Sequence, residues 1–208
     1  MSGSIKITIL CENRVTDPNL VAEQGLSLLI ETADGKVLFD TGQTDTVVRN
    51  AITLGIELET VKKIVLSHGH FDMTGGLKYL LKEIPSPDIY CHPNLFNKKF
   101  KIRDNERIDI GVPWEKGELE GMGAKFILKT RPIEILPNIW MSGEIPRLTS
   151  YEDIDEIYQE QILESFIHDG LHDDLALIIK TDKGLLILMG CGHAGAVNTV
   201  KHAMRMMG

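Results

Sequence analysis

Residues 67–76 have the sequence Ser-His-Gly-His-Phe-Asp-Met-Thr-Gly-Gly and follow the apolar run Lys-Ile-Val-Leu at residues 63–66. The run predicts a buried strand, and the glycines after it predict a turn that leads into a helix. His68, His70 and Asp72 therefore lie on a tight loop at the carboxyl end of a strand, where short side chains can converge on one point. These ligand types suit zinc, and also iron or manganese. For any one of these residues, an ordinary solvated surface position is the alternative. A turn rarely needs two imidazoles and an acid together, so the group favours a metal site.

A second glycine-rich turn follows another apolar run, at residues 190–195 with the sequence Gly-Cys-Gly-His-Ala-Gly. His193 thus has the same local context as His68 and His70, and we expect it to complete three imidazoles around one metal ion. Three imidazoles leave an open position, where bound water can act as a hydroxide nucleophile near neutral pH. Asp72 is then predicted to orient that water or to act as the general base.

The motif at residues 68–76 resembles the HxHxDHxGG signature of the metallo-β-lactamase superfamily, whose members bind one or two metals between two β-sheets flanked by helices. Further similarities cover nearly the whole chain, at residues 24–30, 38–42, 142–147, 173–177 and 190–195. They resemble one subfamily, which includes the dihydropterin-condensing synthase of methanopterin biosynthesis and many predicted metal-dependent hydrolases. The resemblance implies an α/β (α+β) fold, an αββα sandwich, with residues 1–208 forming a single domain.

Two departures from the family pattern concern the second metal position. Met73 stands where the signature has its third histidine, and a thioether is a soft, weak ligand that suits Cu(I) better than Zn²⁺. Family members also supply a last histidine from a strand downstream of the second glycine-rich turn, whereas this sequence ends at Gly208. We therefore expect one zinc ion rather than two, and a C-terminal part that is truncated, degenerate or completed by another chain. An uncovered sheet edge there predicts a homo-oligomer or a separate partner chain.

Three further residues are candidates for the surroundings of the metal. Asp40 ends a predicted buried strand, and a buried acid needs a partner. We expect Asp40 to accept a hydrogen bond from a ligating histidine or from the metal loop, with a helix cap as the alternative. Cys191 lies where related branches carry a bridging Asp or Cys, although packing alone also suits a residue so close to His193. Asp174, at the start of a late strand, is the third candidate.

A cluster of basic residues begins the stretch 96–164, which is the least regular part of the pattern and the expected substrate region. Lys98, Lys99, Lys101 and Arg103 place four cations within six residues of a chain that is otherwise acidic. They are predicted to hold a phosphate or carboxylate above the metal, with Arg147 as a second anion contact. A solvated face is the alternative for such a run.

Periodicity predicts the remaining elements. Strands are expected at residues 5–10, 26–31, 36–40, 89–91, 175–181 and 185–189, and helices at residues 44–54, 77–82, 151–166 and 197–207. The helix at 151–166 is rich in acids and is predicted to face solvent.

Composition agrees with a globular enzyme and excludes several other classes. The 208 residues are 43% hydrophobic and 25% charged, which is ordinary usage for one domain. A net charge of −8 argues against a nucleic-acid partner, which would favour a basic surface. The apolar run at residues 185–189 is far too short to cross a membrane. Three cysteines without a CxxC pair favour a reducing compartment, and we expect a cytoplasmic protein.

The favoured activity is hydrolysis of an ester or phosphoester bond in a small anionic substrate by a metal-bound hydroxide. One alternative is a dihydropterin-condensing transferase, in which the metal and the basic residues stabilise a departing pyrophosphate. Another is a degenerate, non-catalytic domain that binds a ligand or a partner.

Overall fold

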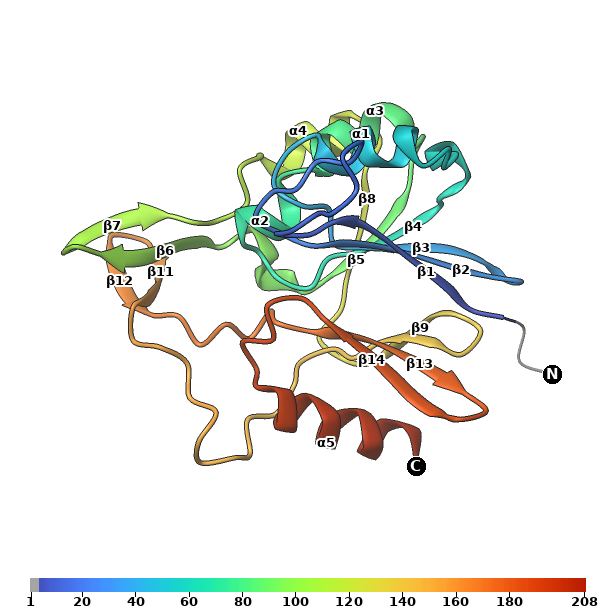
Figure 1. The fold of residues 1–208 in the computed structure, drawn as a ribbon. Coiled ribbons are helices and arrows are strands. Elements are labelled where there is room, and N and C mark those ends of the chain that lie inside the picture. Colours follow the sequence, from blue (N-terminus) through green and yellow to red (C-terminus); the bar gives the residue numbers. More distant parts are fainter. Residues whose placement is uncertain (1–3) are drawn as a thin grey trace.

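The computed structural model describes residues 4–208, and it consists of two facing β-sheets with helices on their outer sides (Figure 1). The first sheet has the order β1 (Lys6–Cys11), β2 (Ser27–Thr32), β3 (Gly35–Phe39), β4 (Lys63–Val65), β5 (Asp88–Cys91) and β8 (Lys125–Leu128). The second has the order β14 (Gly184–Met189), β13 (Ala176–Thr181), β10 (Ile139–Met141) and β9 (Ile133–Leu136). This is the αββα arrangement that the sequence predicted.

Helices cover the outer face of each sheet (Figure 1). Over the first sheet lie α1 (Thr46–Thr53), α3 (Leu77–Glu83) and α4 (Lys116–Gly121), and over the second lies α5 (Ala196–Met207). The short elements η1 (Leu58–Thr60), α2 (Phe71–Thr74) and η2 (Pro93–Phe96) lie in connections between strands and helices. No helix within residues 4–208 is long and apolar enough to cross a membrane.

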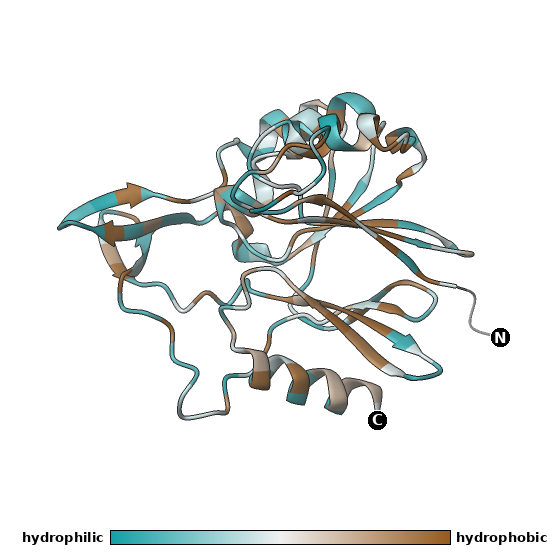
Figure 2. Ribbon diagram, viewed as in Figure 1, coloured by the Kyte–Doolittle hydropathy of each residue, from teal (hydrophilic) through white to brown (hydrophobic). Residues whose placement is uncertain are grey.

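The first sheet is buried on both faces, and its strand residues alternate between two cores. Leu38 of β3 packs with the helices, whereas Val37 and Phe39 pack against the second sheet. Leu29 and Ile30 of β2 divide in the same way. Successive strand residues point to opposite faces, so a strand between two layers must be apolar throughout. The strands of the two facing sheets are accordingly coloured hydrophobic over much of their length (Figure 2), and apolar residues of both sheets form the core between them.

A third sheet projects from one end of the sandwich, and we call it the arm (Figure 1). Its order is β12 (Ser165–His168), β11 (Tyr158–Ile162), β6 (Lys98–Arg103) and β7 (Glu106–Asp109). The helix predicted at residues 151–166 is therefore wrong. β11 forms a strand because it pairs with β6. The helix was predicted from the local spacing of acidic residues, and that spacing does not reveal pairing with a strand so far away in the sequence. The stretch 96–164 is also more regular than expected, since it supplies strands to all three sheets.

The other predicted elements are confirmed to within about two residues at each end. Within residues 4–208, β14 pairs only with β13, so that edge of the second sheet is open. The homo-oligomer or partner chain expected from such an edge stays a prediction.

The loop after β4 is positioned by its neighbours in the first sheet. β4 lies between β3 and β5 and runs parallel to both, so the loops after these strands meet at one edge. The backbone N–H and hydroxyl of Thr41, after β3, both donate to the Met73 carbonyl oxygen at 2.8 Å. A Cβ at Gly76 would lie 2.0 Å from the Thr41 carbonyl oxygen, so only glycine permits this approach.

We expect Ile64→Ala, in the centre of β4, to lower the free energy of unfolding by about 2–5 kcal/mol, because Ile64 is 0% exposed and its removal leaves a cavity. Ile52→Ala makes the same change in α1, where Ile52 is 70% exposed, and should alter stability by less than about 0.5 kcal/mol. Urea unfolding measures both. Equal losses in the two variants would contradict the placement of the core.

Candidate metal centre

Three histidines from the two glycine-rich turns meet at the edge of the facing sheets. His68 and His70 follow β4, and His193 lies between β14 and α5. One ring nitrogen of each lies within 4.8 Å of those of the other two. His68 Nε2 is 3.0 Å from His70 Nδ1, close to the spacing of about 3.3 Å between two nitrogen ligands of a tetrahedral zinc ion.

The protonation of these imidazoles suits metal binding. Burial lowers the pKa of His68 and of His70 well below the ordinary value, and neighbouring cationic groups add to the effect. Burial also lowers the pKa of His193 to about 4. Neutral imidazole is the form that ligates metals. The Nε2 atom of His193 is buried without a hydrogen-bond partner among residues 4–208, as expected for a ligand of a zinc-like ion.

Buried polar groups orient His68 and join the two turns. Ser67 Oγ lies 2.9 Å from His68 Nδ1, and Asp174 Oδ1 lies 3.6 Å from the same nitrogen. Asp174 Oδ2 accepts a 2.7 Å hydrogen bond from the Ala194 backbone N–H, next to His193. Burial raises the pKa of Asp174 to about 7. Asp174 therefore contacts both halves of the histidine cluster.

Asp40 is completely buried at the end of β3 and faces the start of the metal loop. Its Oδ1 accepts a 2.7 Å hydrogen bond from the Ser67 backbone N–H, while Oδ2 has no partner among the described residues. Burial raises the pKa of Asp40 well above its ordinary value. The helix-cap alternative is wrong, because α1 begins at Thr46 and its N-cap residue is Asp45.

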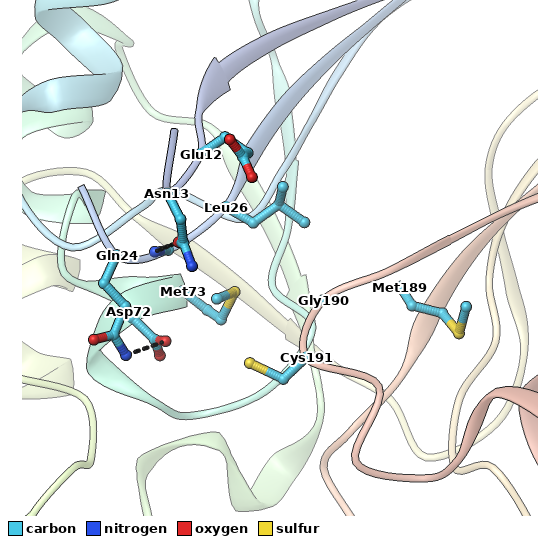
Figure 3. Close-up of a pocket in the computed structure, with 10 residues that line it drawn as sticks. Glu12, Asn13, Gln24, Leu26, Asp72, Met73, Met189, Gly190 and Cys191 are labelled. Carbon is cyan, nitrogen blue, oxygen red and sulfur yellow. Dashed lines mark hydrogen bonds between the residues drawn. The ribbon is translucent and has the colours of Figure 1, made fainter. Parts of the chain in front are cut away.

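A second group of potential ligands lies beside the histidines. Ligand atoms of His68, Asp72 and Cys191 lie within 4.8 Å of one another. Figure 3 shows the thiol of Cys191 pointing across a cavity toward Asp72 and the thioether of Met73. Desolvation raises the pKa of Cys191 to about 12, and the nearby carboxylates contribute. The cavity measures about 670 Å³.

Asp72 is held on the side of this cavity by Gln24, whose Nε2 donates to Asp72 Oδ2 at 3.2 Å. Burial raises the pKa of Asp72, and the Gln24 hydrogen bond partly opposes that shift. The sequence pattern did not identify Gln24 as part of the site, because its loop lies far from the metal loop along the chain.

The four basic side chains of β6 lie in different environments. Lys101 and Arg103 line a cavity of about 320 Å³ together with His70, Asp72 and His193. Lys98 is exposed and, by the alternation of the strand, faces the opposite side. These placements bring two of the four predicted cations to the site.

Lys99 does not reach the cavity, and its predicted role in substrate binding is wrong. The side chain is 1% exposed, and Nζ donates at 2.9 Å to carboxylate oxygens of both Asp169 and Asp173. Burial acts to lower the pKa of Lys99, but the two carboxylates more than reverse that effect and leave the pKa raised.

Arg147 also has a different role from the predicted anion contact. Its guanidinium donates to the carbonyl oxygens of His193, Gly170 and Leu171 at 2.6–2.8 Å. Three of its N–H groups are thus engaged by backbone, and Arg147 fixes the turn that carries His193. A sequence pattern cannot distinguish such a structural arginine from one that binds a ligand.

Tyr158 of the arm forms a wall of the site that the sequence pattern missed. Its ring stacks on His70 with centroids 5.7 Å apart and meets His193 edge-on at 5.2 Å. Tyr158 lies within the segment predicted as a solvent-facing helix, so no local signal placed it here.

Comparisons with known proteins agree with this architecture. Residues 20–191 match the family model of the metallo-beta-lactamase superfamily. The chain is 34% identical, over 90% of its length and 67% of the relative's, to the 7,8-dihydropterin-6-methyl-4-(beta-D-ribofuranosyl)-aminobenzene-5'-phosphate synthase of Methanocaldococcus jannaschii. It is 33% identical to an uncharacterized protein of the same organism, over 96% of this chain and 74% of the other.

A solved structure is also similar, that of a metal-dependent hydrolase of the beta-lactamase superfamily. It has a TM-score of 0.80 and 25% sequence identity, with 97% of this chain and 72% of that one covered. The fold and the histidine cluster define a metal-binding scaffold. The chain belongs to the metallo-beta-lactamase superfamily.

We expect the purified protein to hold about one equivalent of a tightly bound zinc-like metal. His193→Ala should weaken binding by more than about 100-fold, since even loss of a residue that supports a ligand costs about 10–100-fold. Elemental analysis and a competitive zinc titration measure both quantities.

His172→Ala is the matched control, because His172 is exposed and lies outside the histidine cluster. It should bind metal like the unmodified protein. Two tightly held ions per chain, or equal losses in the two variants, would contradict this assignment.

Proposed function

We propose that this protein is a metal-dependent hydrolase that cleaves an ester or phosphoester bond in a small anionic substrate. The observation that carries the proposal is the position of the histidine cluster. It opens onto a cavity with the carboxylate of Asp72 and the cations of Lys101 and Arg103 in its walls. This combination of groups supports catalysis over ligand binding alone.

The residues around the cavity would have distinct roles in this reaction. A zinc-like ion bound by the three histidines would polarise the scissile group and lower the pKa of water. Asp72, whose pKa is raised by burial, is suited to accept a proton from the attacking water. Gln24 keeps the carboxylate oriented. Lys101 and Arg103 are placed to bind a phosphate or carboxylate on the substrate.

The shape of the cleft favours a substrate with two unlike ends. The cavity beside Lys101 and the larger cavity beside Met73 share Gln24, Asp72 and Cys191 in their walls. One molecule can therefore lie across both, with its anionic group near the arm. The thioether of Met73 offers its other end a polarizable apolar surface.

A transferase that releases pyrophosphate is the second candidate, and the 34% identity to a synthase favours it. The same histidines and cations would then stabilise the departing group. Turnover in H₂¹⁸O separates the candidates, because hydrolysis places ¹⁸O in a product and transfer between two organic substrates does not. A protein that binds metal but turns over neither kind of substrate would support the non-catalytic alternative.

We expect Lys101→Met to raise KM for an anionic ester by about 10–100-fold, because an ionic hydrogen bond contributes about 1.5–3 kcal/mol. The kcat should change less. Initial rates with p-nitrophenyl phosphate and carboxylate-bearing aryl esters provide the measurement.

Lys98→Met is its control, since it removes the same charge from the same strand on the face away from the cavity. Its kinetics should match those of the unmodified protein. An equal rise in KM would mean that the net charge of the arm, rather than contact with the substrate, is responsible.

A further inference from the structure

Buried charged side chains connect the arm to the loop that carries His68 and His70. We propose that Asp173, anchored by Lys99 of the arm, is a positioning residue that sets the geometry of these histidines and therefore the metal affinity. The inference rests on the metal centre of the proposed function, but it does not depend on which substrate is cleaved.

The contact to the metal loop is made at Gly69, the residue between the two histidines. Its backbone N–H donates to Asp173 Oδ2 at 2.8 Å. The loop has little room to shift at this point, since a Cβ at Gly69 would lie 2.0 Å from the Leu95 carbonyl oxygen. A hydrogen bond at Gly69 therefore acts on the backbone from which both imidazoles project.

The other oxygen of Asp173 is held by the arm. Asp173 Oδ1 accepts a 2.9 Å hydrogen bond from Lys99 Nζ, and the two side chains are 0% and 1% exposed. A buried carboxylate without a cationic partner is strongly unfavourable, so Lys99 fixes where Asp173 can lie. The orientation of a metal ligand depends on such supporting contacts, and their loss costs about 10–100-fold in metal affinity.

Asp169 provides an internal comparison, because it is likewise a buried carboxylate paired with Lys99, but its side chain makes no hydrogen bond to the metal loop among the described residues. It is 2% exposed and its Oδ2 lies 2.9 Å from Lys99 Nζ. Its Oδ1 accepts a 2.7 Å hydrogen bond from the Leu171 backbone N–H instead of from Gly69. Loss of Asp169 should loosen the arm without acting on Gly69.

The arm also carries Lys101, Arg103 and Tyr158, which line the cavity over the histidines. Lys99 lies on the same strand as two of them. The contact from Lys99 through Asp173 to Gly69 therefore couples the placement of the substrate-binding side chains to that of the metal ligands.

The test compares Asp173→Asn with Asp169→Asn. In each variant the single amide oxygen can serve only one of the two donors that the carboxylate served. We expect Asp173→Asn to weaken zinc binding by about 10–100-fold in a competitive titration with a chromophoric chelator, and to shift the visible bands of the Co²⁺-loaded protein. Asp169→Asn should change zinc affinity by less than about 3-fold and leave the Co²⁺ spectrum unaltered.

Both variants should lose similar stability in the metal-free state, since each loses one partner of Lys99. An unchanged zinc affinity in Asp173→Asn would overturn the inference, and so would equal losses of affinity in the two variants. If Asp173→Asn does not fold, Asp173→Glu replaces it. That variant keeps the negative charge opposite Lys99 but moves the carboxylate relative to the Gly69 N–H, and the same loss of zinc affinity is expected.

The titration uses zinc or cobalt alone and no substrate. Normal metal binding without hydrolysis would therefore count against the proposed function only, whereas a defect shared equally by both variants would count against this inference only. Failure of the unmodified protein to bind either metal would overturn both.

Discussion

The burial of charged groups next to the histidine cluster is the constraint on which the rest of the site depends. Asp169, Asp173 and Asp174 are all at most 2% exposed, and a buried carboxylate is tolerated only when a specific partner faces it. Their partners are Lys99 of the arm and backbone groups of both glycine-rich turns. A single short segment thus joins both turns to the arm, whose strands contribute no residue to either large hydrophobic cluster among residues 4–208.

This arrangement explains why an open cleft can remain well defined. The two large cores lie within the αββα layers, and neither includes a residue of the arm in the part of the chain that the structure describes. Polar contacts are directional, so they fix the arm and the turns in one relative position where apolar packing would allow several. The metal ligands and the walls of the cavity gain preorganisation from the same set of hydrogen bonds, as precise chemistry requires.

The cleft is asymmetric around the histidines, and the asymmetry bears on function. One side has Lys101 and Arg103 on the arm, and the other has Met73 in a position where the family signature has a histidine. A thioether ligates zinc weakly, so that side is better suited to contact a substrate than to hold a second ion. The carboxylate of Asp72 lies between the two sides, where the proposed function uses it to accept a proton from water.

The sequence by itself determined most strands and helices and the three histidines, because strand periodicity and glycine-rich turns are local signals that act over a few residues, and its family resemblance implied the αββα fold. It did not determine what the basic run does. Lys99 and Lys101 are indistinguishable in the pattern, yet one is buried between carboxylates and the other faces the cavity. Tyr158 and the arm were missed for the same reason. Strand pairing and ion pairing between distant segments decide these roles, and only the tertiary structure brings those segments together.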